Sequence, residues 1–158
     1  MTKIILGLMG MGKTKTLISL VKEAVSKDSE KQNDSIKFDN IVICGSRLWS
    51  VPGSPNFNEQ DEKLYNRETE RLRLSLKSAS KLREEGDKLI ALIHFPPFNV
   101  RREDTSFTKL FEEFNVNSVV YGHLHGKNVR ADKLVLKNGI KYYLTACDQV
   151  ENKLTEIE

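Results

Sequence analysis

The sequence predicts an α/β protein, a layered sheet with flanking helices. Short apolar runs such as residues 41–44, 89–94 and 116–121 alternate with longer segments in which apolar residues recur at helical spacing. Near the end of the chain, two further runs enclose Asn138-Gly139, a strong two-residue signal for a β-hairpin. The element order is therefore βα, βα, βα and ββ, in which helices join parallel strands.

Composition and charge favour one globular unit. The 158 residues are 39% hydrophobic and 30% charged, values near the average of globular domains. Lysine and arginine number 25 against 22 acidic residues, and because both signs are scattered we expect no nucleic-acid binding. No apolar run is long enough to span a bilayer, so we expect no membrane partner. Cys44 and Cys147 lie in apolar runs typical of free thiols, which favours a cytoplasmic location.

Residues 1–30 have a β-loop-α pattern of their own, with a strand predicted at 3–6 and a helix at 13–25. Between them, Gly7-Leu8-Met9-Gly10-Met11-Gly12-Lys13-Thr14 matches the G-x-x-x-x-G-K-[ST] pattern and resembles the opening of P-loop nucleotide-binding proteins. The resemblance implies a loop shaped by Gly7 and Gly12 around the phosphates of ATP or GTP. Lys13 would contact the phosphates and Thr14 the Mg²⁺ of the Mg-nucleotide.

The P-loop resemblance does not continue downstream. No later strand ends in the aspartate that P-loop enzymes use to organise Mg²⁺. The alternative is a glycine-rich turn between a strand and a helix, without bound nucleotide. Residues 26–34 are polar and predict a solvated linker, so we divide the chain into a P-loop-like segment at 1–30 and a domain at 31–158.

The elements of the second segment follow from periodicity and from residues that start or stop helices. Residues 41–44 predict a strand, and a loop rich in glycine, serine and proline follows it. Residues 58–85 predict a long helix with Gly86 as its stop signal, and residues 89–94 predict the next strand.

The last third of the chain predicts one short helix and three strands. Thr105 can cap a helix whose phenylalanines and Leu110 recur at helical spacing. A strand at 116–121 follows, and residues 133–137 and 140–145 predict the hairpin.

All three histidines of the chain follow predicted strands. His94 ends the run at residues 89–94, and the other two lie in Gly122-His123-Leu124-His125-Gly126, directly after the strand at 116–121. Sites in α/β sheets collect at the carboxyl ends of strands, and imidazole nitrogens are common metal ligands. We therefore expect one metal site formed by His94, His123 and His125. The alternative is that each imidazole is merely a hydrogen-bonded group at a strand edge.

The histidine motifs resemble those of a known family. Leu92-Ile93-His94-Phe95-Pro96-Pro97-Phe98 and Val120-Tyr121-Gly122-His123-Leu124-His125-Gly126 are similar to the last two metal motifs of calcineurin-like metallophosphoesterases. The likeness to bacterial predicted phosphohydrolases of that family extends from about residue 32, through Arg47-Leu48-Trp49, to Cys147-Asp148. One departure is Leu48, where the family favours glycine.

The resemblance implies a metal-dependent phosphoesterase that acts on small phosphate esters. Two divalent ions of manganese, iron or zinc would serve the reaction, because these ions suit mixed imidazole and carboxylate ligands. By the family pattern, His94 and His123 would bind one ion and His125 the other. The implied fold is the C-terminal half of the family's two-sheet sandwich.

The first three metal motifs of the family are missing from this sequence. No histidine follows asparagine or has aspartate two residues before it, and Gly86-Asp87 lies between a predicted helix end and a strand. We therefore expect a truncated member with weak or no hydrolysis. Loss of the first sheet of the sandwich would expose apolar faces and favour self-association. The alternatives are a P-loop module that binds ATP or GTP and a non-functional fusion or fragment.

Overall fold

The computed structural model of the chain describes residues 4–6, 30–32 and 35–157. Its described part contains a seven-stranded mixed sheet of order β2-β3-β4-β5-β6-β8-β7 and a two-stranded sheet of β1 and β9. The strands are β1 (Ile4–Leu6), β2 (Glu30–Gln32), β3 (Ser35–Phe38), β4 (Ile41–Ser46), β5 (Lys88–Ile93), β6 (Ser118–Tyr121), β7 (Leu134–Lys137), β8 (Ile140–Leu144) and β9 (Thr155–Ile157). The helices are α2 (Glu59–Leu82) and α3 (Ser106–Glu113). The α/β class predicted from the sequence is confirmed.

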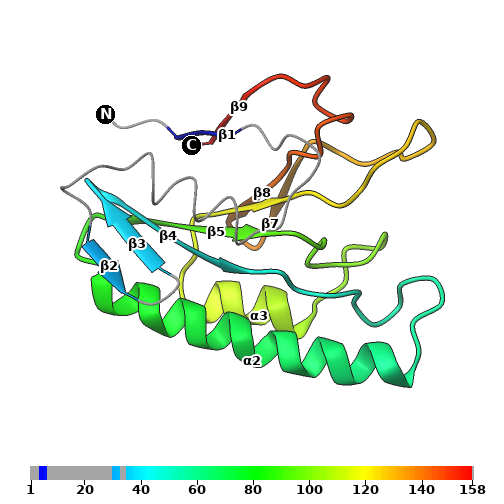
Figure 1. Cartoon of the computed structure of the whole chain (residues 1–158), viewed down its shortest axis with the longest axis horizontal. Coiled ribbons are helices and arrows are strands. Elements are labelled where there is room, and N and C mark those ends of the chain that lie inside the picture. Colours follow the sequence, from blue (N-terminus) through cyan, green and yellow to red (C-terminus); the bar gives the residue numbers. More distant parts are fainter. Residues whose placement is uncertain (1–3, 7–29, 33–34, 158) are drawn as a thin grey trace.

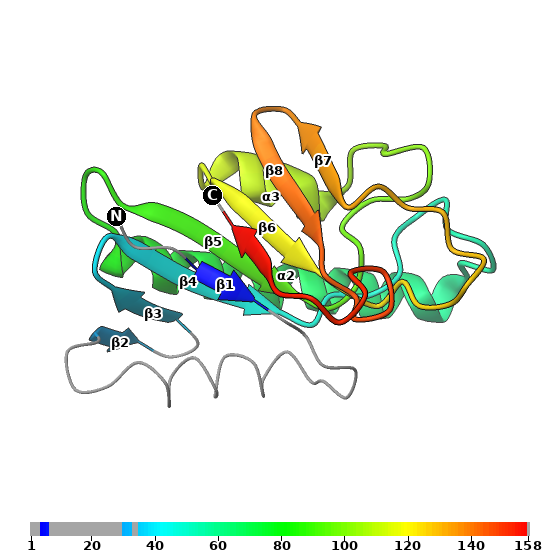
Figure 2. The same ribbon diagram turned by 90° about the horizontal axis from the view of Figure 1, so that it is seen from above.

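The centre of the large sheet is parallel, and its two outer parts are antiparallel. β4, β5, β6 and β8 run side by side in one direction (Figure 2), and each pairs with the next in parallel register. β3 pairs with β4 and β7 pairs with β8 in antiparallel register. Because the four central strands share one direction, their carboxyl ends meet at one edge of the sheet.

The two helices cover one face of the sheet (Figure 1). Leu72, Leu76 and Ala79 of α2 and Phe107 and Phe111 of α3 are fully buried against the strands. These are residues that the helical spacing of the sequence places on the apolar faces. The larger of the two hydrophobic clusters lies in this layer.

The opposite face of the sheet is also covered in the described part of the chain. β9, paired with β1, lies over this face (Figure 1), and Ile157 belongs to its hydrophobic cluster. The members of that cluster are each at most 7% exposed: Ile36, Ile41, Ile43, Ile90, Leu92, Val120, Tyr143 and Ile157. This cluster is therefore not an exposed apolar face, whereas Leu134 and Leu136 of β7 are 52% and 71% exposed, and self-association stays a prediction.

The polar stretch at residues 26–34 is more structured than predicted. Glu30–Gln32 forms β2, which pairs with β3 in antiparallel register, where we expected a solvated linker. Edge strands are stabilised by backbone hydrogen bonds that any side chain permits, so apolar periodicity does not reveal them. β3 and β9 were not predicted either, because each is too short to show a clear apolar alternation.

The long helix begins where predicted and ends earlier. Asn58 is its N-cap, and a capping box joins the Asn58 and Asp61 side chains to the first-turn backbone. At the other end Arg83 adopts an extended conformation, three residues before the Gly86 stop signal. The Arg83 guanidinium donates hydrogen bonds to the carbonyl oxygens of Asp87, Phe114 and Asn115. These tertiary contacts favour leaving the helix at Leu82.

Other local signals are confirmed. The Thr105 side chain accepts from the backbone N–H of Thr108, which completes a capping box at the start of α3. Asn138 and Gly139 both have positive φ angles, 50° and 80°, as a type I′ turn requires. Both cysteines are free thiols. Among the described residues, neither helix has the length and apolarity needed to cross a membrane.

Leu48, the departure from the family pattern, lies in an unusual backbone conformation. Its φ angle is 60°, in the left-handed region, and its side chain is fully buried. A non-glycine residue in this region costs about 1–2 kcal/mol. Glycine would avoid this cost, whereas leucine adds buried apolar surface to the core.

Two substitutions at Leu48 should separate these effects. Both Leu48→Ala and Leu48→Gly should lower the free energy of unfolding by about 2–5 kcal/mol, because the buried side chain is lost. The glycine variant should be more stable than the alanine variant by about 1 kcal/mol, since only glycine adopts the left-handed region without strain. Urea unfolding measures the difference. A glycine variant that is less stable than the alanine variant would contradict this backbone assignment.

Candidate metal centre

The three histidines lie at the carboxyl edge of the parallel strands, as predicted. His94 follows β5, and His123 and His125 follow β6. Backbone hydrogen bonds between neighbouring strands continue past the strand ends. The Gly122 N–H donates to the His94 carbonyl oxygen at 3.2 Å, and the His94 N–H donates to the Arg47 carbonyl oxygen at 3.3 Å. The backbones that carry His94 and His123 are therefore fixed to each other.

His94 and His123 are brought together directly. The Nε2 atom of His94 lies 3.2 Å from the Nδ1 atom of His123. The His123 ring also stacks on Phe95, with ring centroids 4.0 Å apart and an angle of 32° between the planes. His123 has a φ angle of 67°, in the left-handed region, and in this backbone conformation its ring lies next to that of His94. Packing and backbone conformation together determine where the two nitrogens point.

Partial desolvation shifts the pKa of both imidazoles downward, although the His123 residue as a whole is exposed. Burial lowers the pKa of His94, and the neighbouring His123 and Arg47 charges lower it further. Burial likewise lowers the pKa of His123, with smaller contributions from His125 and Arg47. A neutral imidazole nitrogen is the form that binds a metal ion.

The His94–His123 pair fits a divalent metal ion. Two nitrogens that bind one ion at about 2.1 Å each, roughly 100° apart, are separated by about the distance seen here. The measured separation between His94 Nε2 and His123 Nδ1 is 3.2 Å. This distance is compatible with two adjacent ligand positions of one ion.

His125 faces a different group. Its Nδ1 atom lies 2.8 Å from Oδ1 of Asp148, and the Gly126 N–H donates to Oδ2 of the same carboxylate at 2.7 Å. The Gly126 and His125 hydrogen bonds lower the pKa of Asp148. Ligand atoms of His125, Cys147 and Asp148 all lie within 4.8 Å of one another. The structure thus separates the three histidines into a pair and a second group.

Asp148 and Cys147 are site residues that the sequence reasoning missed. They follow β8, which is the neighbour of β6 in the sheet. Sites collect at the carboxyl ends of strands, so these residues could have been found if the position of β8 next to β6 had been known.

Comparison with family models gives one match. The model described as calcineurin-like phosphoesterase matches residues 19–127, more than two thirds of the 158-residue chain. The chain belongs to the calcineurin-like phosphoesterase family. Comparisons with curated proteins and with solved structures gave no match.

Membership of this phosphoesterase family accounts for the histidines and for the fold. His94, His123 and His125 all lie within the matched residues, and family members typically bind divalent metals. The mixed sheet with two helices on one face is consistent with part of a metallophosphoesterase fold.

The P-loop resemblance receives no such support. Gly7, Gly12, Lys13 and Thr14 precede the residues that the family model matches. They also lie outside the described residues. The domain boundary between residues 30 and 31 remains a prediction. The match to the phosphoesterase family model begins before this boundary, at residue 19.

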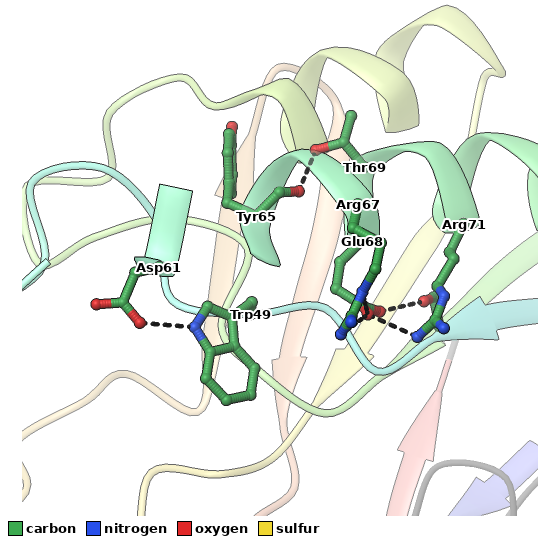
Figure 3. A network of polar contacts seen from close by, with 8 residues as sticks. Trp49, Asp61, Tyr65, Arg67, Glu68, Thr69 and Arg71 are labelled. Carbon is green, nitrogen blue, oxygen red and sulfur yellow. Dashed lines mark hydrogen bonds and ion pairs between the residues drawn. The ribbon is translucent and has the colours of Figure 1, made fainter. Parts of the chain in front are cut away.

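Polar contacts join the loop after β4 to α2. The Arg47 guanidinium lies 4.7 Å from the centre of the Trp49 ring, and Trp49 Nε1 donates to Asp61 Oδ1 at 2.8 Å (Figure 3). Glu68 of α2 is almost fully buried. It accepts from Arg67, Arg71 and Ser46, the last at 3.3 Å (Figure 3). Because these groups occupy the Glu68 carboxylate, it stabilises the loop and is not open to a metal ion.

A cleft of about 730 Å³ opens beside His123. Its walls combine apolar side chains with charged ones, and Arg102 and Asp132 form an ion pair in the wall. Ligand pockets are lined mainly by apolar and aromatic side chains with a few polar groups. The cleft has such a lining, which includes Phe95, Phe98, Asn99, Tyr121, Leu124 and Arg130. The cleft can therefore hold a small organic group next to the histidine pair.

The lowered pKa values of His94 and His123 predict a pH-dependent stability of the metal-free protein. Their folded pKa values lie below the ordinary value of 6.5. As the pH falls through about 6.5 the unfolded chain binds protons first, so the free energy of unfolding should decrease from about pH 7.5 to pH 5. Urea unfolding at several pH values measures this slope.

The matched variant His94→Gln/His123→Gln should have a smaller slope over the same pH range, because it lacks both groups. An NMR titration of the wild type should place the midpoints of these two imidazoles below the ordinary value. Midpoints at or above that value, or identical slopes for both proteins, would contradict the burial argument.

Proposed function

We propose that this chain is a metal-dependent phosphoesterase that hydrolyses small phosphate esters slowly. The observation that carries the proposal is the His94–His123 pair, whose Nε2 and Nδ1 atoms lie 3.2 Å apart beside a cleft. Membership of the calcineurin-like phosphoesterase family supports it, because the matched residues include both histidines.

His94 and His123 would hold one divalent ion, and His125 the other. Of the divalent ions that the family implies, iron and zinc suit imidazole ligands best. When bound, such ions polarise phosphate oxygens and lower the pKa of bound water. The protein contributes the orientation of the ligands, through the stacking of His123 on Phe95 and the backbone hydrogen bonds at the strand ends.

The cleft beside His123 is the proposed position of the substrate. Phe98 and Tyr121 offer apolar surface for the organic part of an ester, and Arg130 in the same wall offers positive charge for phosphate. A small-molecule phosphate ester combines both features. This character favours a small ester over a long polymer.

Slow hydrolysis follows from the carboxylates that the chain lacks at the pair. The family's Asp-x-His, Gly-Asp and Gly-Asn-His motifs do not precede His94 as metal motifs. Among the described residues, Asp148 contacts His125 and Gly126, and Glu68 is held by arginines. A carboxylate that bridges two ions positions them for attack on phosphate, so its loss lowers the rate.

The proposal predicts that metal affinity and residual activity depend on the histidine pair. His94→Ala/His123→Ala should weaken manganese or zinc binding by at least about tenfold, because both ligands of one ion are lost. Calorimetry measures the affinity, and release of nitrophenol from p-nitrophenyl phosphate measures the activity, which should disappear with it.

Asn128→Ala is the matched control, since Asn128 is exposed in the loop that follows the histidine motif. It should retain both metal binding and activity. Unchanged affinity and activity in the double histidine variant would contradict the proposed function.

A further inference from the structure

We infer that His125, Cys147 and Asp148 form a second metal-ion site that binds Zn²⁺ or Co²⁺ through a cysteine thiolate. This inference rests on the proposed function only in its use of His125. The proposed site shares no ligand with the His94–His123 pair. Two of its ligands, Cys147 and Asp148, come from the loop after β8.

The sheet brings these residues together from separate parts of the chain. β6 and β8 are parallel neighbours, with Tyr121 paired to Leu144. Their pairing continues one residue further, since the Thr145 N–H donates to the Tyr121 carbonyl oxygen at 2.8 Å. The loops that leave the two strands therefore start side by side, one carrying His125 and the other Cys147 and Asp148.

The two loops are also tied to each other. The Asp148 carboxylate accepts from the Gly126 N–H at 2.7 Å, and Gln149 Nε2 donates to the Gly126 carbonyl oxygen at 3.2 Å. His125 Nδ1 lies 2.8 Å from Asp148 Oδ1. These contacts order both loops before any ion binds, which lowers the entropic cost of assembling a site.

The group is accessible to an ion from solvent. The side chains of His125 and Asp148 are 48% and 39% exposed, and Cys147 is partly buried. Ligand atoms from the three residues lie within 4.8 Å of one another. One nitrogen, one sulfur and one oxygen ligand leave a fourth position of a tetrahedral ion open to water or substrate.

The chemistry of the three ligands selects the ion. Thiolate and imidazole favour Zn²⁺ and Co²⁺, whereas Mg²⁺ and Mn²⁺ prefer oxygen ligands. Binding replaces the Cys147 S–H bond with a sulfur–metal bond, and the released proton goes to solvent. Cys44 offers no such ligand, because it is fully buried and burial raises the pKa of its thiol to about 12.

Co²⁺ titration of the full chain tests the inference. A thiolate bound to Co²⁺ gives a charge-transfer absorption band in the near ultraviolet, and only Cys44 and Cys147 can supply it. We expect the band in the wild type, its loss in Cys147→Ser, and at least about tenfold weaker Co²⁺ binding at this site in that variant. Cys44→Ala is the matched control and should retain the band.

A third variant separates this inference from the proposed function. His94→Ala/His123→Ala should retain the thiolate band while it loses the ion held by the histidine pair. X-ray absorption of the zinc-loaded wild type requires no substitution and should give a sulfur neighbour at about 2.3 Å.

Three results would overturn the thiolate site. They are a wild type without the band at saturating Co²⁺, a band that persists in folded Cys147→Ser, and zinc with only nitrogen and oxygen neighbours. The last result would show that the Cys147 thiolate is not a ligand of the ion.

Discussion

The parallel hydrogen bonding of β4, β5, β6 and β8 determines where this protein can bind a ligand. Each strand of this set ends at the same edge of the sheet, and the chain continues there as Arg47, His94, Gly122 and Thr145. Hydrogen bonds between these following residues extend the pairing beyond the strands. A shift of register would separate the histidines and move the apolar residues to the wrong faces, so the core and the site depend on the same pairing.

The edge of the sheet holds two groups of ligands with different surroundings. His94 and His123 lie against Phe95, and partial desolvation lowers the pKa of both imidazoles. His125 instead contacts Asp148, in loops that solvent reaches. The first group resembles half of a dinuclear centre without its bridging ligand, and our proposal of metal binding with slow hydrolysis rests on this. The second group has its own carboxylate and thiol, which can hold an ion independently.

Much of the fold follows from local signals in the sequence. The strands that form the parallel centre are short apolar runs, and the start of the long helix, the cap at Thr105 and the turn at Asn138-Gly139 occur as predicted. The positions of β2, β3 and β9 could not be predicted, because segments of three or four residues are too short to show a periodic apolar signal. The early end of α2 depends on Arg83, whose partners are about thirty residues away in sequence.

The candidate site was predicted in part. The placement of all three histidines at strand ends follows from the sequence, and their family is confirmed by the match at residues 19–127. The separation of His125 from the pair could not be predicted, because it depends on the order β6-β8 in the sheet and on the loop that carries Asp148. The left-handed conformation of His123 is likewise set by packing on Phe95.

The most direct test of this account is the position of a bound ion at the His94–His123 pair. Crystals of the protein loaded with zinc or manganese, measured at the absorption edge of the metal, would give an anomalous difference map. We expect a peak within bonding distance of both His94 Nε2 and His123 Nδ1. A map without a peak there, with the two rings still contacting each other in the loaded protein, would contradict the claim that this edge of the sheet is a metal centre.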